Sequence, residues 1–282
     1  MNILLTGADG FTGRHFIQSA TQTGHHITSL KVDLTDPAAV AAQVQGTQPD
    51  AVVHLAAISF VGNADSAAFY AVNVIGSMNL LAALAALPKA PAKVLLASSA
   101  NIYGNCDSSP IAEDQPPAPV NHYAASKLAM EHMARTFADR LPMVITRPFN
   151  YTGAGQGGQF LIPKLVDHFA RRAPYIELGN LHVEREFNDV RMVCQAYLDL
   201  LQHGQAGQAY NVCSGQTYTL QDVMDILTCI TSHQIEVMVN PAFVRSNEVH
   251  RLCGTPAKLT ACTGPLPAIE LRDTLQWMLE QA

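Results

Sequence analysis

Three glycines follow the first apolar run of the chain, and they restrict its fold more than any other feature. Residues 3–6 form the run, and Gly7, Gly10 and Gly13 come directly after it. This spacing is typical of the turn between the first strand and first helix of a dinucleotide-binding unit, where glycines allow close approach of the backbone to a pyrophosphate. The N-terminus of the helix then provides donors for the phosphates. A glycine-rich turn without a ligand would share the triplet, but its position favours the nucleotide site.

Further short apolar runs alternate with helical patterns along the first half of the chain. Runs too short for helices occur at residues 3–6, 51–55, 93–97 and 143–146. Residues 77–87 and 121–140 have helical patterns that stop near Pro88 and Pro142. This alternation predicts an α/β fold with a doubly wound parallel sheet of the Rossmann type.

The pattern changes after Asn150. A glycine-rich loop at residues 153–158 precedes short mixed elements, whereas residues 188–203 and 209–212 again have the pattern of a helix and a strand. We therefore expect a Rossmann domain of residues 1–150 plus about 187–214. A smaller, discontinuous substrate-binding lobe would comprise about 151–186 plus 215–282.

The composition narrows the classes of partner. The 282 residues are 48% hydrophobic, and only 14% are charged, with a formal net charge of −6 and scattered cations, so no nucleic-acid partner is expected. The longest apolar-rich stretches, such as residues 80–87, are shorter than the roughly 20 residues of a membrane span, and no secretory signal precedes the first strand. We expect a cytoplasmic protein without a membrane partner. Its six cysteines lack C-x-x-C spacing and are expected to be reduced and buried, with no metal site.

Tyr123 and Lys127 are the strongest catalytic candidates. A separation of four residues places both side chains on one face of the predicted helix. A nearby ammonium would lower the pKa of the phenol and make it an acid or base at neutral pH. Ser99 follows a buried strand and is the hydroxyl expected to hold a substrate oxygen beside Tyr123, with Ser98 as its competitor.

The end of the second predicted strand, at residues 26–30, bears on the type of dinucleotide. No acidic residue stands there to bind ribose hydroxyls, whereas Lys31 and Arg14 could face a 2′-phosphate. NADP(H) is therefore favoured, with NAD(H) as the alternative. Asp33 and Leu34 could contact the adenine, although Asp33 fits equally well as a turn residue.

These motifs resemble those of the extended short-chain dehydrogenase/reductase family. The resemblance covers most of the chain: the glycine turn, Ser99, the Tyr-x-x-x-Lys pair, residues 53–57, Asn73 on a helix near the active site, and residues 147–156. It implies a dinucleotide site lined by Gly7, Asp9, Gly10, Phe11, Thr12, Gly13, Arg14, Asp33, Leu34, Leu55, Ala56, Ala57, Asn73, Tyr123, Lys127 and Pro148.

Within that family the chain is most similar to bacterial reductases of GDP-6-deoxy-4-keto-D-mannose. The resemblance implies a nucleotide-diphosphate sugar as substrate, with contacts from Ser99, Asn101, Asn150, Arg185, Arg245 and Glu248. An ion pair of Arg185 with Glu184 or Glu186 is the structural alternative. Met192 stands where many relatives carry an acid, which puts that local network in doubt. Asn101 stands where the related dehydratases need an acid, which disfavours dehydration.

The expected reaction is reduction of a sugar C4 ketone, with GDP-D-rhamnose as the product. The alternatives are a reductase that forms GDP-6-deoxy-D-talose, a 4-epimerase with tightly bound NAD, and, more distantly, a non-catalytic NAD(P)-binding regulator. The resemblance also implies a homodimer formed through the helices that contain Ser77 and Tyr123.

Overall fold

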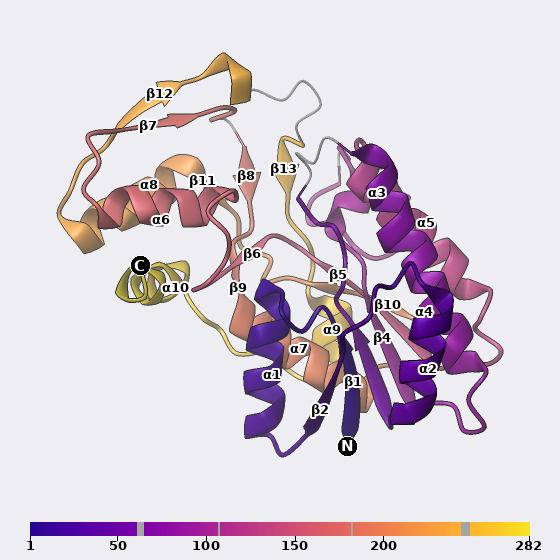
Figure 1. Cartoon of the computed structure of the whole chain (residues 1–282). Coiled ribbons are helices and arrows are strands. Elements are labelled where there is room, and N and C mark those ends of the chain that lie inside the picture. Colours follow the sequence, from indigo (N-terminus) through magenta and orange to yellow (C-terminus); the bar gives the residue numbers. More distant parts are fainter. Residues whose placement is uncertain (61–64, 107, 182, 244–248) are drawn as a thin grey trace.

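The computed structural model of the chain describes every residue except 61–64, 107, 182 and 244–248 (Figure 1). Within the described residues, a six-stranded parallel sheet has the order β10-β5-β4-β3-β1-β2. Its strands are β1 (Asn2–Thr6), β2 (His26–Leu30), β3 (Ala51–His54), β4 (Lys93–Ala97), β5 (Met143–Pro148) and β10 (Ala209–Val212). The predicted doubly wound α/β fold is confirmed, and residues 209–212 rejoin the sheet as predicted.

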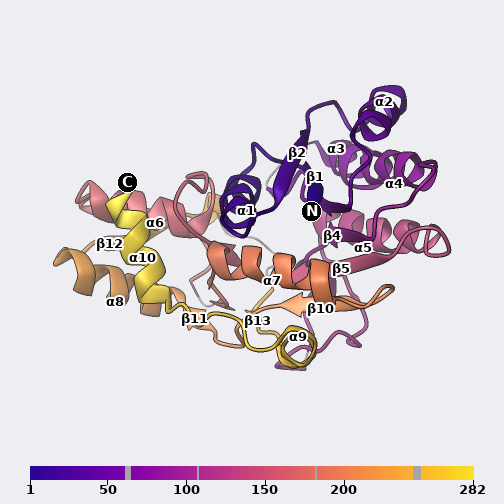
Figure 2. The same cartoon turned by 90° about the horizontal axis from the view of Figure 1, so that it is seen from below.

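Helices cover both faces of this sheet (Figure 2). On one face lie α1 (Phe11–Gln22), α7 (Val190–His203) and α9 (Ala257–Thr263), and on the other α2 (Pro37–Thr47), α4 (Ser77–Ala85) and α5 (His122–Arg135). Alternate side chains of β1 enter different cores: Ile3 and Leu5 pack with α1 and α7, whereas Leu4 packs with α2 and α4. Because both faces of the sheet are covered, the inner strands β1, β3 and β4 contain unbroken runs of buried apolar residues. The edge strand β2 is partly exposed and includes the polar residues Thr28 and Ser29.

A continuous helical segment precedes and includes α4. It begins with α3 (Ser66–Tyr70), passes through a π-helical turn (Ala71–Gly76) and runs to Ala85. The segment has 20 residues, and an 18-residue window within it has a mean hydropathy of 1.6, so by length and composition alone it is long and apolar enough to cross a membrane. The sequence-based estimate, which considered shorter apolar stretches, did not identify this segment. Half of the segment is buried in the fold, where it packs against α2 and α5.

The second lobe has its own core. Its helices are α6 (Leu161–Ala170), α8 (Leu220–Thr231) and α10 (Leu271–Glu280), which enclose a cluster of buried residues together with β7 (Tyr175–Leu178). β12 (Glu236–Val239) pairs with β7, and β8 (Glu184–Arg185) lies between β11 (Tyr218–Thr219) and β13 (Arg251–Leu252). One element departs from the predicted division of the chain, since α9 packs against α7 and β10 on the Rossmann side.

The cysteines do not share one environment. Cys194, Cys213 and Cys253 are buried and Cys106 and Cys262 are partly buried, but Cys229 is exposed, so the expectation of uniformly buried cysteines was wrong.

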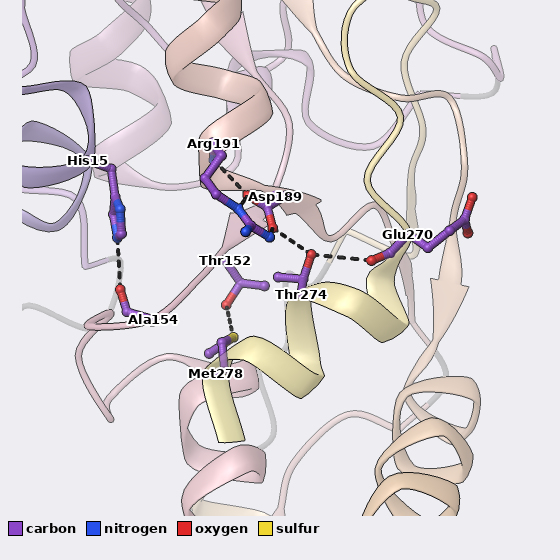
Figure 3. A network of polar contacts seen from close by, with 8 residues as sticks. All are labelled: His15, Thr152, Ala154, Asp189, Arg191, Glu270, Thr274 and Met278. Carbon is purple, nitrogen blue, oxygen red and sulfur yellow. Dashed lines mark hydrogen bonds and ion pairs between the residues drawn. The ribbon is translucent and has the colours of Figure 1, made fainter. Parts of the chain in front are cut away.

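A buried carboxylate joins the two lobes. Asp189 lies in β9 (Asn188–Asp189), which pairs with β6 (Tyr151–Thr152), and it caps the N-terminus of α7 through the Arg191 amide. Its Oδ2 accepts hydrogen bonds of 2.7 Å from both the Arg191 guanidinium and the Thr274 hydroxyl of α10 (Figure 3). Met192, where the resemblance led us to expect an acid, packs in the core. The carboxylate at this junction is that of Asp189.

Asp189→Ala should lower the free energy of unfolding by about 2–4 kcal/mol, because it removes a helix cap and the 2.7 Å acceptor of the buried Thr274 hydroxyl, which is left with the 3.4 Å contact to the Glu270 carbonyl. Denaturant titration measures the change. The control is Asp167→Ala, which removes an exposed pair with Arg171 and should cost no more than about 0.5 kcal/mol. Equal effects of the two substitutions would contradict the role assigned to Asp189.

Candidate active site

A cavity of about 460 Å³ includes the carboxyl edge of the parallel sheet in its wall. It brings together most of the residues that the sequence predicted for the site. Those in its wall are Gly7, Gly10, Phe11, Thr12, Gly13, Leu55, Ala56, Ala57, Ser99, Asn101, Tyr123, Lys127, Pro148 and Asn150.

The glycine turn lines the cavity, and at Gly7 and Gly13 it leaves no room for a side chain. Gly7 has a φ of +72°, and a Cβ there would lie 2.7 Å from the Ala56 backbone nitrogen. A Cβ on Gly13 would lie 2.1 Å from the carbonyl oxygen of Gly7. The turn leads directly into α1, whose N-cap is Gly10. A turn packed this closely, with helix amides at its end, fits the diphosphate of a dinucleotide.

His54 holds the second wall of the cavity in place. Its Nδ1 lies 2.6 Å from the Thr6 hydroxyl and its Nε2 lies 2.7 Å from the Ser77 hydroxyl. Burial, together with the nearby Lys127 ammonium, lowers the pKa of His54 to about 3, so its ring is neutral at physiological pH. Because Thr6 also accepts a hydrogen bond from the Ala56 amide, this buried chain fixes the loop after β3 against the glycine turn.

Asn73 acts through the same loop and does not line the cavity. Its side-chain oxygen accepts from the Ile58 amide, and its nitrogen donates to the Ile58 carbonyl and to the Ser126 hydroxyl of α5. The side chain is buried in the π-helical turn. Its amide therefore connects the loop to α5, and its role as a cofactor contact stays a prediction.

The environment of the Tyr123 phenol differs from the expected one. Burial raises its pKa, and the Ser99 hydroxyl, which acts as its hydrogen-bond partner, partly opposes this rise. The expected lowering of this pKa by Lys127 was wrong for the protein without ligands, because loss of solvation is the largest effect. A phenol in this environment stays protonated at neutral pH, which suits it to donate a proton.

Lys127 extends from the same helix to the end of β4. Its ammonium donates a 2.7 Å hydrogen bond to the carbonyl oxygen of Ala97, directly before the two serines. Burial lowers the pKa of Lys127 to about 8, against the effect of Glu131, which raises it. At neutral pH the ammonium form still predominates.

The two serines after β4 have different surroundings. Ser99 caps the short helix that follows, accepting from the Asn101 amide, and it interacts with Tyr123. Ser98 also lines the cavity, but its buried hydroxyl has no hydrogen-bond partner among the described residues. The contact with Tyr123 favours Ser99 as the substrate-facing hydroxyl.

The cations expected to bind phosphates have other partners. Arg14 donates to the carbonyl oxygens of Asp9 and Gly155, which ties the glycine turn to the loop at residues 153–158. Arg185 is buried and donates to the carbonyl oxygens of Glu184, Val249 and His250. Neither Arg14, Asp9 nor Arg185 lines the cavity. Arg245 and Glu248 lie outside the described residues.

The proposed adenine contacts are not in the cavity wall either. Asp33 is exposed and accepts hydrogen bonds from the amide and hydroxyl of Thr35. These are the contacts of a turn residue, which was the alternative interpretation of Asp33. Leu34 is buried, and a Cβ on Gly76 would lie 2.8 Å from the Leu34 Cβ.

Several residues of the wall were not predicted. Tyr151 is the most informative, since its hydroxyl lies 2.8 Å from that of Thr12 and its ring stacks on Phe11 at 6.1 Å. The signal that could have identified it is its position directly after Asn150, beyond the end of a predicted strand. The other unpredicted residues are Ser59, Ala97, Phe149, Gln156, Phe160 and Tyr197.

A parallel sheet with a glycine cradle at its carboxyl edge, facing a Ser-Tyr-Lys set, defines an NAD(P)-dependent oxidoreductase of the extended short-chain dehydrogenase/reductase class. The family model described as GDP-mannose 4,6 dehydratase matches residues 14–278. The chain belongs to this family.

Relatives with curated names are similar over nearly the whole chain. GDP-6-deoxy-D-talose 4-dehydrogenase of Aggregatibacter actinomycetemcomitans is 36% identical, over 94% of this chain and 92% of that protein. GDP-6-deoxy-D-mannose reductase of Pseudomonas aeruginosa is 35% identical, over 98% and 95%. The solved structure of RMD from Pseudomonas aeruginosa complexed with NADPH has a TM-score of 0.92 and 33% identity, and covers 99% of this chain and 98% of that one.

Gly7→Ala should weaken NADPH binding by about tenfold or more, roughly 1.4 kcal/mol, because the new Cβ would displace the loop at Ala56. Fluorescence titration with NADPH measures the affinity. Gly24→Ala is the matched control, since Gly24 has a similar φ of +78° but open space around it. Unchanged affinity in Gly7→Ala would exclude the turn as the dinucleotide site.

Proposed function

We propose that the protein reduces the C4 ketone of GDP-4-keto-6-deoxy-D-mannose with NADPH and forms GDP-D-rhamnose. The observation that carries the proposal is the arrangement of Ser99, Tyr123 and Lys127 in the wall of one cavity that the glycine turn also lines. The names of the relatives support a GDP-linked 6-deoxy sugar. NADP(H) is the proposed cofactor because the Pseudomonas aeruginosa protein was solved with NADPH; NAD(H) stays the alternative.

Each residue has a role set by its chemistry. When bound, the reduced dinucleotide supplies the hydride. Tyr123 gives its proton to the C4 oxygen as negative charge develops there, and the Ser99 hydroxyl donates a hydrogen bond to the same oxygen. The Lys127 ammonium, fixed on the Ala97 carbonyl, stabilises the phenolate that remains.

Asn101 is the residue that disfavours a dehydratase reaction. It lines the cavity two residues after Ser99, and its amide can hydrogen-bond a sugar hydroxyl but cannot transfer the proton that loss of water requires. A 4-epimerase with tightly bound NAD is the second enzyme that this set of residues would serve. It would turn over without added reductant.

The deciding experiment follows NADPH absorbance after the purified protein is mixed with GDP-4-keto-6-deoxy-D-mannose. We expect stoichiometric oxidation and a product identified as GDP-D-rhamnose by NMR. GDP-6-deoxy-D-talose as the product would keep the reductase class and change the face of attack. No oxidation with this or with UDP- and dTDP-linked 4-keto sugars would refute the proposal, and interconversion of C4 epimers without NADPH would favour the epimerase.

Tyr123→Phe should reduce kcat by about 10²–10⁴, because it removes the proton donor and keeps the ring. NADPH should still bind, since phenylalanine keeps the ring in the cavity wall and only the hydroxyl is lost. Steady-state kinetics and NADPH titration on the same preparation test both statements. Wild-type turnover in this variant would mean that another group is the acid.

We also propose a homodimer that packs through the helical segment at residues 66–85. Three large apolar side chains of this segment are exposed: Tyr70 (36%), Ile75 (45%) and Met78 (37%). Light scattering should give the mass of two 30.4 kDa chains, and Ile75→Glu should give that of one. A monomeric wild-type protein would remove the proposal.

A further inference from the structure

Three ionisable side chains lie in a row along α5. Tyr123, Lys127 and Glu131 are separated by four residues each, so they lie on successive turns of one helical face. All three are buried, Glu131 most completely, with 1% of its surface exposed. The first two belong to the proposed catalytic set. Glu131 is not a member of that set.

The Glu131 carboxylate is held from the neighbouring strand. Arg147 of β5 donates from Nε to Oε1 at 3.0 Å and from Nη2 to Oε2 at 2.8 Å. The guanidinium is itself fixed, because its Nη1 donates to the Tyr103 hydroxyl and to the Glu113 carbonyl, both at 2.9 Å. The carboxylate therefore has a set position one helical turn from Lys127.

The groups around Lys127 leave its charge with few partners. On α5 it faces Tyr123 and Glu131, and on β3 it acts on His54, which is neutral. The elements that pack against α5 and β4 also carry Tyr70, Tyr103, Arg147 and Tyr197, and β4 itself carries Lys93. Glu113 directs its carboxylate to the Asn211 amide. Burial lowers the pKa of Lys127 to about 8, and Glu131 is the group whose charge opposes that effect.

We propose that Glu131 is a positioning residue for the reaction: held by Arg147, its carboxylate keeps the Lys127 amine in the charged form that assists Tyr123. The contribution of Glu131 to catalysis rests on the proposed function. Its effect on the protonation of Lys127 does not. Above pH 8 the amine loses its proton, and the reaction should slow. Without Glu131 this loss should occur at lower pH.

NMR of ¹³Cε-labelled lysine measures the titration directly in the protein without ligands. The chain has six lysines, and Lys127→Arg assigns the signal of Lys127. In the wild type we expect a midpoint near pH 8. In Glu131→Gln the midpoint should fall by about one pH unit or more, because an adjacent opposite charge has been removed.

Two further variants separate this effect from a structural one. Glu113→Gln makes the same change at a carboxylate that accepts from the Asn211 amide, and the Glu113 backbone carbonyl can still accept from Arg147. This variant should leave the Lys127 midpoint unchanged. Glu131→Gln combined with Arg147→Met removes the buried pair together, which protects folding if the single variant is unstable. Its midpoint should also fall, because the carboxylate of Glu131, which raises the pKa of Lys127, is absent from this variant as well.

The pH profile of kcat completes the test. In Glu131→Gln its alkaline limb should move down with the NMR midpoint, whereas Glu131→Asp, which keeps the charge, should restore it towards the wild type. An unchanged Lys127 midpoint in Glu131→Gln, or an equal shift in Glu113→Gln, would overturn the proposal. An NMR shift in a protein without ketone reductase activity would leave the role of Glu131 intact and reject only the proposed reaction.

Discussion

The register of the parallel sheet is the constraint on which the site depends. Thr6 pairs with His54, His54 with Leu96, and Ala97 with Thr146, so neighbouring strands end at one edge. The residues that follow each strand therefore meet there although they are about 50 positions apart in the chain. A slip of one residue in β3 or β4 would turn its alternating side chains to the wrong core and remove the loop after it from the cavity.

Around this edge, buried polar side chains act as a frame. His54 joins β1, β3 and α4, Asn73 joins the loop after β3 to α5, and the Arg147–Glu131 pair joins β5 to α5. Each of these groups would cost free energy if it were buried without a partner, so each contact also selects one arrangement of the elements. The Ser98 hydroxyl differs, since it lies in the cavity wall and has no such partner in the part of the chain that the structure describes.

The fold could be predicted from the sequence because its signals are local. Apolar runs of four or five residues, the glycine turn and the Tyr-x-x-x-Lys spacing depend on neighbours in the chain. The roles of Asn73, Arg14 and Arg185 could not be predicted, because their partners are set by where distant segments return. Arg14, for example, donates to a carbonyl 141 residues away. The π-helical turn at Asn73 could not be predicted for the same reason. Asn73 contacts the loop after β3, which is distant in the sequence, and the spacing of apolar residues in the helix gives no sign of the turn.

Two residues at the start of α7, Asp189 and Met192, have different parts in the junction between the lobes. A methionine there extends the apolar face of α7 into the core, and the carboxylate function lies three residues earlier at Asp189. From that position one side chain caps α7, binds Arg191 and receives the Thr274 hydroxyl of the C-terminal helix. Arg191 in turn stacks on Trp277 at 4.2 Å. The orientation of α10 relative to α7, and with it one side of the junction between the lobes, therefore depends on a short polar network at the start of α7.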